Sequence, residues 1–219
     1  SSTCATYGIP SENDIPIVEN HFQNPINPYG HSKLMIERIL RDYHKAYNQP
    51  VAILRYFNAA GADSKGDIGE DHNPETHLIP LILKALDSDE GTINVFGDDY
   101  NTFDGTCIRD YIHVEDLANA HVLSLNKIIK DKSISIYNLG SGKGHSIMQV
   151  IKTARRVTGK DIKIIKAPRR EGDPPILISS NKKAREELKW QPEFSELETI
   201  IKSAWIWHKY SQREKLTMK

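Results

Sequence analysis

The first regular pattern of hydrophobic positions follows a proline-rich segment near the start of the chain. Apolar side chains recur every three or four residues over 28–47, the spacing that places them on one face of an α-helix. Asn27 is a favourable N-cap, and Pro28 fits the first turn because the N–H groups there have no partner within the helix. The pattern predicts an amphipathic helix over 28–47, whose apolar face is formed by Ile36, Ile39, Leu40, Tyr43 and Tyr47.

The rest of the chain alternates short apolar runs with helical patterns. Polar segments rich in glycine and aspartate predict loops between them, most clearly at 59–76 and 98–107. This alternation of strands and helices indicates an α/β fold. The predicted strands are 51–58, 93–97 and 161–168, together with a strand at the start of 109–129 and another at the start of 135–146. The other predicted helices are 77–86, the segment after Asp116, 146–158, 181–190 and 196–213.

Composition limits the classes of protein that the chain can represent. Its 219 residues suit one large domain or two small ones, and 29 basic residues balance 29 acidic ones. That balance gives no electrostatic footprint for nucleic acid or for an anionic membrane surface. Cys4 and Cys107 lie far apart, so we expect two reduced thiols rather than a metal pair. With no run of about 18 apolar residues and no signal-peptide pattern, the expected setting is the cytoplasm.

Tyr29 and Lys33 are the first candidates for chemistry. Four residues apart on a helix, they share one face. A cation beside a phenol favours the phenolate, which can accept a hydroxyl proton and return it. Thr3 could hydrogen-bond the same substrate oxygen from the end of a strand. The alternative is a solvated helix pair, because chance matches to Tyr-x-x-x-Lys are common.

The glycines of "GSGKG" at 140–144 do not form a known phosphate-binding motif. A dinucleotide fingerprint requires glycine at 145, where the chain has histidine. A P-loop requires glycine at 137 and serine or threonine at 144, where the chain has tyrosine and glycine. We therefore expect a tight turn that leads into the following helix.

The loop at 69–77 gathers residue types that bind metals. Its two histidines, His72 and His77, do not have the spacing of the helical zinc pattern. Loop residues of this kind are usually hydrogen-bonded to one another, so we expect no metal here. A Ser/His/Asp hydrolase is likewise unsupported, since no histidine stands at a suitable spacing from a nucleophile. The candidate ligands were Glu70, Asp71, His72, Glu75 and His77.

Two later segments carry arginines suited to an anionic ligand. Arg109 and Tyr111 occupy alternate positions of a predicted strand and therefore face the same way. Arg170 and Asp173 lie in a loop bounded by proline and glycine. Guanidinium groups bind phosphate oxygens, and a carboxylate binds sugar hydroxyls. Together these residues would suit a sugar attached to a diphosphate.

Seven blocks follow one another in unbroken order from residue 1 to about 190: "SSTCATYG", "NPINPYGHSK", "LRYFNAAGA", "GEDHNPETHLIP", "VFGDDYNTFDGTCIRDYIHVEDLA", "IYNLGSGKG" and "APRREGDPP". Through these blocks the chain resembles the UDP-glucose 4-epimerases of the extended short-chain dehydrogenase/reductase superfamily. The resemblance implies the C-terminal part of a Rossmann-type doubly wound parallel sheet plus a smaller α/β substrate-binding domain. Residues 1–60 would belong to the NAD-binding domain and 61–219 mainly to the UDP-sugar-binding domain, with 108–122 returning to the first. The family's glycine-rich NAD-binding segment is expected to lie outside this chain.

The resemblance also implies an activity, the interconversion of UDP-galactose and UDP-glucose. NAD would oxidise the sugar at C4, and the 4-keto sugar would turn over and be reduced on its other face. Tyr29 would take the proton from the 4-hydroxyl while Thr3 hydrogen-bonds the reacting oxygen. Lys33 would support the phenolate and bind the nicotinamide ribose. NAD supplies the redox step, and the protein supplies position and electrostatics.

Further site residues follow from the same blocks. Phe57 would lie near the cofactor, and the two arginines would hold the diphosphate. Many relatives have asparagine where this chain has His77. Leu177 stands where the family varies between tyrosine and smaller residues, so we expect turnover of UDP-N-acetylglucosamine and UDP-N-acetylgalactosamine as well. The implied substrate contacts are Thr3, Asn58, His77, Leu78, Phe96, Arg109, Tyr111, Arg170, Asp173 and Leu177.

Three alternatives compete with this assignment. A nucleotide-sugar 4,6-dehydratase is disfavoured, because related enzymes place Asp-Glu where this chain has Cys4 and Ala5. A UDP-pentose 4-epimerase and a non-catalytic nucleotide-sugar-binding fragment stay open. The resemblance also implies a homodimer through the helix at 28–47, although its apolar face could equally point into the core.

Overall fold

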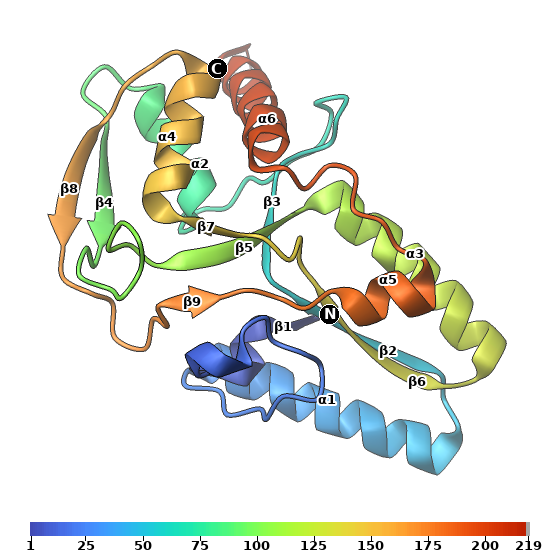
Figure 1. Cartoon of the computed structure of the whole chain (residues 1–219). Helices are drawn as coiled ribbons and strands as arrows, with labels where there is room; N and C mark the ends of the chain where they lie inside the picture. Colours follow the sequence, from blue (N-terminus) through green and yellow to red (C-terminus); the bar gives the residue numbers. More distant parts are fainter. Residues whose placement is uncertain (218–219) are drawn as a thin grey trace.

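The computed structural model describes the backbone of residues 1–217 and the side chains of residues 1–212. The chain has an α/β fold in which mainly parallel strands form three small sheets with helices packed on them (Figure 1). This confirms the predicted fold class. Within the described part of the chain, no helix combines the length and the apolar character needed to cross a membrane.

The first sheet consists of three parallel strands in the order β1 (Ser2–Thr3), β2 (Val51–Tyr56) and β6 (Ile134–Leu139). Helix α1 (Pro28–Tyr47) covers one face, and α3 (Val114–Asp131) and α5 (Lys182–Leu188) cover the other (Figure 1). Along β2, Leu54 packs against α3 and α5, whereas Arg55 points to α1. Burial on both faces explains why 51–56 is nearly continuous in apolar residues.

The second sheet is built around β5 (Ile108–His113), which pairs in parallel with β3 (Asn58–Ala60) and β9 (Ile176–Leu177) and antiparallel with β7 (Gly144–Ser146). Phe57 separates β2 from β3. Its backbone N–H still bonds to the Leu139 carbonyl of the first sheet at 3.0 Å, while Asn58 already pairs with Tyr111 of the second. The run predicted as one strand over 51–58 is therefore two strands of two sheets.

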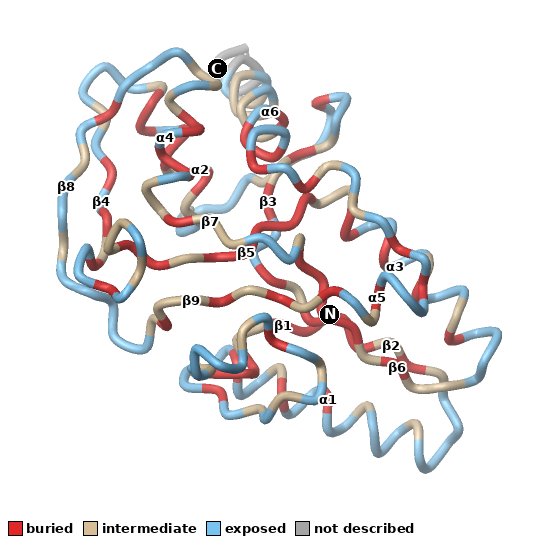
Figure 2. The backbone as a smooth tube through the Cα atoms, viewed as in Figure 1, coloured by how far each residue is buried: buried red, intermediate tan, exposed pale blue. Residues whose placement is uncertain are grey.

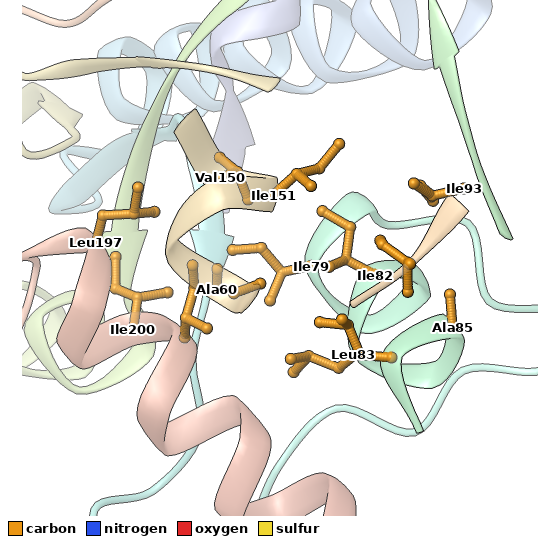
Figure 3. Close-up of a cluster of buried hydrophobic side chains, with 14 of the residues drawn as sticks. Ala60, Ile79, Ile82, Leu83, Ala85, Ile93, Val150, Ile151, Leu197 and Ile200 are labelled. Atoms are coloured by element: carbon orange, nitrogen blue, oxygen red, sulfur yellow. The ribbon is translucent and has the colours of Figure 1, made fainter. Parts of the chain in front are cut away.

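The larger hydrophobic core lies among α2 (Leu78–Leu86), α4 (Ile147–Thr158) and α6 (Leu197–Thr217), beside the parallel pair β4 (Thr92–Phe96) and β8 (Lys163–Ala167). Side chains from these helices converge in Figure 3, and Figure 2 shows the same helices buried on their inward faces. Ile82, Ile151 and Ile200 are fully buried. Each such side chain contributes about 1.5–3 kcal/mol to folding.

Helix α3 begins earlier than the sequence predicts. His113 Nδ1 accepts a hydrogen bond from the backbone N–H of Glu115 at 3.1 Å, so the helix starts at Val114. Asp116, expected to precede the helix, lies in its first turn and accepts a hydrogen bond from the Ser195 hydroxyl at 2.5 Å. The fully buried Trp190 donates to the Asp116 carbonyl at 3.0 Å. These bonds tie α3 to the segment between α5 and α6.

Asp87, at the end of α2, joins three parts of the larger core. Its carboxylate accepts hydrogen bonds from Lys160 at 2.7 Å and from Lys209 at 2.9 Å. Partial burial opposes ionisation, but the two ammonium groups outweigh it and lower the pKa of Asp87 to about 2. This carboxylate therefore stabilises the fold above the ordinary aspartate pKa, and the contribution is lost as pH falls toward 2.

We predict that Asp87→Asn lowers the free energy of unfolding by about 1 kcal/mol at neutral pH, because it leaves both ammonium groups without a counter-charge. Urea unfolding of the chain at pH 7 and at pH 2.5 measures the effect. The difference between Asp87→Asn and the parent chain should shrink at the lower pH. An equal difference in unfolding free energy at pH 7 and at pH 2.5 would show that the ionisation of Asp87 does not stabilise the fold.

Candidate active site

Tyr29 and Lys33 lie on the first two turns of α1, as their spacing predicts. Asn27 caps the helix by accepting the Gly30 N–H at 2.8 Å. The Lys33 ammonium lies 5.8 Å from the centre of the Tyr29 ring and donates to the Ser1 carbonyl at 3.1 Å. Tyr29 is 57% exposed, so its phenol is accessible to a ligand.

Thr3 ends β1, the strand that contacts α1, and lies in register with Tyr56 of β2. Its hydroxyl oxygen accepts the Ala5 N–H at 3.2 Å. Helix α1 packs closely on the segment after Thr3, since a Cβ on Gly30 would lie 2.6 Å from the Ala5 carbonyl oxygen. We call Thr3, Tyr29 and Lys33 the Tyr–Lys corner.

A buried polar network joins the elements that carry this corner. Glu37 on α1 pairs with Arg55 on β2 through two hydrogen bonds, Nε to Oε1 at 2.9 Å and Nη2 to Oε2 at 2.6 Å. Ser2 on β1 donates to Oε1 of the same carboxylate at 2.5 Å. Both charged side chains are 1% exposed. Burial would raise the pKa of Glu37, but the hydrogen bonds from Arg55 and Ser2 outweigh it, so the pKa is lowered and the carboxylate stays charged.

The predicted diphosphate residues meet at one side of β5. Arg109 forms an ion pair with Asp173 and is 8% exposed. Burial would lower the pKa of Arg109, but Cys107 and Asp173 outweigh it and raise the pKa. Arg170 lies with its guanidinium carbon 4.0 Å from the centre of the Phe96 ring. A guanidinium stacked on an aromatic face keeps its N–H groups at the edge, where an anion can reach them.

A second set of predicted residues lines a cavity of about 640 Å³. Tyr111 faces it from β5, two residues after Arg109, and so connects the cavity to the arginine side. Burial raises the pKa of Tyr111, which therefore remains a neutral hydrogen-bonding phenol. The predicted contacts in this lining are Asn58, His77, Leu78 and Tyr111.

Phe57 and Leu177 are placed differently from the others. They are buried together with Tyr7 and Ile17 in a small hydrophobic cluster. Leu177 also pairs in register with Arg109 across β5 and β9. Both side chains therefore pack beneath the surface beside predicted site residues, and neither is exposed at the cavity lining.

The 70–77 loop folds so that its histidines and glutamates converge at the cavity. His77 Nδ1 lies 2.7 Å from Glu70 Oε1 and 2.9 Å from Glu75 Oε1. Glu75 also accepts the backbone N–H groups of Thr76 and His77 at 2.7 Å, just before α2 begins. These hydrogen bonds account for the arrangement, and the expectation of no metal stays a prediction.

The "GSGKG" turn binds a carboxylate of the chain itself. Asp110, fully buried on β5, accepts hydrogen bonds from Ser141 N–H at 2.7 Å, Gly142 N–H at 3.1 Å and the Ser179 hydroxyl at 2.6 Å. The turn leads into β7 before α4, not directly into the helix as the sequence predicts. By holding Asp110, it fixes the strand that presents Arg109 and Tyr111.

Comparison with known proteins identifies the family of the chain. The model of the NAD dependent epimerase/dehydratase family matches residues 1–140. The chain belongs to this family. It is 54% identical over 208 residues to a UDP-glucose 4-epimerase from Streptococcus mutans, covering 95% of this chain and 62% of that protein.

Solved structures of this family show the same fold. A UDP-glucose 4-epimerase from Brucella ovis in complex with NAD is 48% identical, with a TM-score of 0.88 over 93% of this chain and 62% of that one. A Bifidobacterium longum UDP-glucose 4-epimerase in complex with NAD+ and UDP is 39% identical, with a TM-score of 0.89 over 97% and 63%. The chain thus spans a little over three-fifths of the length of these relatives.

The donors of the Tyr–Lys corner suit a ribose, the sugar that NAD, the cofactor of the epimerase/dehydratase family, carries. The Lys33 ammonium has three donors, and the structure shows one of them bound to the Ser1 carbonyl. The exposed Tyr29 hydroxyl stands beside it. This donor set suits the hydroxyls of a ribose. Within the described residues, the turn at 140–142 is occupied by Asp110 and offers no pyrophosphate cradle.

The sequence did not point to Ser2, Glu37, Arg55 and Asp110, although all four organise the site. Glu37 stands four residues after Lys33, so helical spacing alone places it on the same face as Tyr29. A glutamate on a helix is normally solvated, however, and its partner lies on another element. Only the packed structure shows the pairing.

We predict that Gly140→Ala destabilises the chain by about 1–3 kcal/mol. A Cβ there would lie 2.4 Å from Ser179 Oγ and 2.5 Å from Asp110 Oδ2, so the bonds around the carboxylate must break. The control is Gly159→Asn, because Gly159 ends α4 in the left-handed conformation with open space around it, and asparagine tolerates that conformation. Urea unfolding should separate the two variants. Equal stability would show that the turn does not depend on Asp110.

Proposed function

We propose that this chain forms the substrate-binding and proton-transfer part of an enzyme that interconverts UDP-galactose and UDP-glucose through NAD-dependent oxidation and reduction at C4. The observation that carries the proposal is the Tyr–Lys corner, in which Lys33 binds the Ser1 carbonyl just before β1 and Tyr29 is open to a ligand. The named relatives are UDP-glucose 4-epimerases.

The chemistry of the corner follows from its donors and acceptors. Tyr29 takes the proton of the sugar 4-hydroxyl and later returns it. Lys33 stabilises the phenolate form of Tyr29 that accepts this proton, because the ammonium and the phenolate carry opposite charges. Thr3 donates its hydroxyl hydrogen to the reacting sugar oxygen. NAD, when bound, supplies the hydride acceptor and donor.

The remaining predicted residues hold the substrate. Arg109 and Arg170 bind the diphosphate, and Asp173 orients the guanidinium of Arg109 in addition to its expected contact with a sugar hydroxyl. Asn58, His77, Leu78 and Tyr111 contact the sugar from the cavity, and Phe96 contributes an aromatic face. The diphosphate stays fixed at the arginines while the 4-keto sugar turns over.

We further propose that residues 1–60 belong to the NAD-binding domain and 61–219 mainly to the UDP-sugar-binding domain. The packing of α3 on β2 and β6 supports the return of 108–122 to the first domain. The outer edge of β1 has no partner strand among the described residues, and we assign it to the cofactor-binding segment implied by the relatives. The free thiols of Cys4 and Cys107 support a reducing, cytoplasmic setting.

Dehydration is a poor fit to the Tyr–Lys corner. Burial raises the pKa of Cys4 to about 11, so this thiol remains protonated at neutral pH. Ala5 next to it carries no titratable group. The acid and base needed to eliminate water across C5 and C6 are therefore missing directly after Thr3, and 4-epimerisation is the chemistry that the corner supports.

The test is a chimera in which the N-terminal part of the Streptococcus mutans epimerase is joined ahead of Ser1. It should purify with NAD and convert UDP-galactose to UDP-glucose. Turnover of UDP-N-acetylglucosamine is a separate expectation, which rests on the family position of Leu177 and not on the cavity, because the Leu177 side chain is not part of the cavity lining. Tyr29→Phe should lower kcat by about a hundredfold or more, because it removes the proton acceptor.

The matched control is Tyr137→Phe, which removes a phenol bonded to Glu187 on the other face of the sheet and should retain activity. Binding of UDP-sugar without turnover, in a chimera that contains NAD, would favour a non-catalytic binding module. Activity on UDP-galactose with none on UDP-N-acetylglucosamine would contradict only the expected turnover of N-acetyl sugars.

We also propose that the protein is a homodimer through α1. This helix carries a stripe of exposed apolar side chains, and the ring centres of Tyr43 and Tyr47 lie 5.2 Å apart on it. Exposed apolar patches of this kind mark interaction surfaces, and a second copy of the same helix is a self-complementary partner. The exposed residues are Met35, Ile36, Ile39, Tyr43 and Tyr47.

We predict that Ile39→Glu converts the chimera from a dimer to a monomer, because it places a charge in the apolar face of α1. Light scattering coupled to size exclusion measures the mass. Val122→Glu on α3 is the control, since Val122 is comparably exposed and lies on the opposite face of the sheet. A parent chimera that is monomeric would exclude the dimer.

A further inference from the structure

The geometry of the Tyr–Lys corner depends on how far α1 is shifted along its axis relative to β1. Tyr29 and Lys33 are carried by the helix, whereas Thr3 is carried by the strand. A helix rises 1.5 Å per residue, so a slip of less than one residue would already separate the phenol from the threonine hydroxyl. Catalysis at this corner therefore requires a bond that fixes the helix against the strand.

Glu37 makes that bond. It lies one turn after Lys33 on the same helix, and its Oε1 accepts the Ser2 hydroxyl at 2.5 Å. Ser2 is 4% exposed and immediately precedes Thr3. The contact thus joins the helix to the strand one residue from the predicted catalytic threonine.

Arg55 fixes the direction of the Glu37 carboxylate. Its guanidinium binds both carboxylate oxygens, and Arg55 is the register partner of Ser2 across β1 and β2. A bidentate arginine–carboxylate pair fixes the orientation of the carboxylate as well as its distance from the guanidinium. Its charges contribute little to net stability, because burying them costs about as much free energy as their attraction returns. The pair is therefore better explained by geometry than by stability.

We propose that Glu37 is a positioning residue, which holds Tyr29 and Lys33 in register with Thr3 through Ser2 on one side and Arg55 on the other. The inference rests on the proposed function, because it concerns the same corner. Glu37 does not touch the substrate and acts only through the placement of α1.

The chain offers a matched pair of variants that separates position from stability. Ser2→Ala removes the hydrogen bond from β1 to Glu37. Gln23→Ala removes a different hydrogen bond to the same carboxylate, from Nε2 to Oε2 at 3.1 Å, which ties down the loop before α1 and not the strand. Arg55 still satisfies the charge of Glu37 in both variants, so both should fold and lose similar stability.

In the chimera we expect Ser2→Ala to lower kcat about tenfold with an unchanged KM for UDP-galactose, because small misplacements of a catalytic group are costly while the arginines that bind substrate are untouched. Gln23→Ala should keep the parent kcat. A crystal structure of the Ser2→Ala protein should show Lys33 Nζ displaced from the Ser1 carbonyl, 3.1 Å away in the parent.

An unchanged kcat in Ser2→Ala, or an equal fall in both variants, would overturn the positioning role and leave the proposed function intact. An undisplaced Lys33 in the Ser2→Ala structure would overturn it independently of any activity. An inactive parent chimera would contradict the proposed function itself, and the positioning role would fall with it.

Discussion

The ion pair between Glu37 and Arg55 is the constraint on which the arrangement of the first sheet depends. It lies between α1 and β2 and is almost fully buried. Removing one partner of such a pair leaves a charge without compensation and costs about 3–5 kcal/mol. Arg55 also donates to the Tyr7 hydroxyl at 2.8 Å, and Tyr7 in turn donates to Asn138 on β6 at 2.6 Å. One guanidinium thus connects the helix to all three strands of the sheet.

Strand β5 has a corresponding role in the second sheet, where three successive residues make three different contacts. Arg109 is held by Asp173, Asp110 is enclosed by the turn at 140–142, and Tyr111 reaches the cavity. Because Asp110 binds so many backbone and hydroxyl donors, the strand cannot rotate about its axis without breaking them. The two residues on either side of it are thereby presented in fixed directions.

The sequence predicts well those features that depend on local chemistry. The helix at 28–47 has the predicted bounds, because Asn27 caps its start and Asn48 adopts the left-handed conformation at its end. The pairing of Tyr29 with Lys33 follows from helical spacing in the same way. The two-residue strand β9 carries no periodicity and is defined only by its pairing with β5, so no pattern could reveal it. The break at Phe57 and the burial of Glu37 are likewise decided by partners distant in sequence.

The short connection at Phe57 has a mechanical consequence. The first sheet and the second are joined there by one residue, whose N–H belongs to the first and whose successor pairs within the second. Phe57 is also embedded with Leu177, which lies on β9 beside Arg109. A rotation of one sheet relative to the other must therefore pass through two backbone torsions that are already enclosed by packed side chains. The Tyr–Lys corner and the ion pair of Arg109 with Asp173 are thus joined through a packed connection, and a change in their relative placement would require Phe57 and Leu177 to repack.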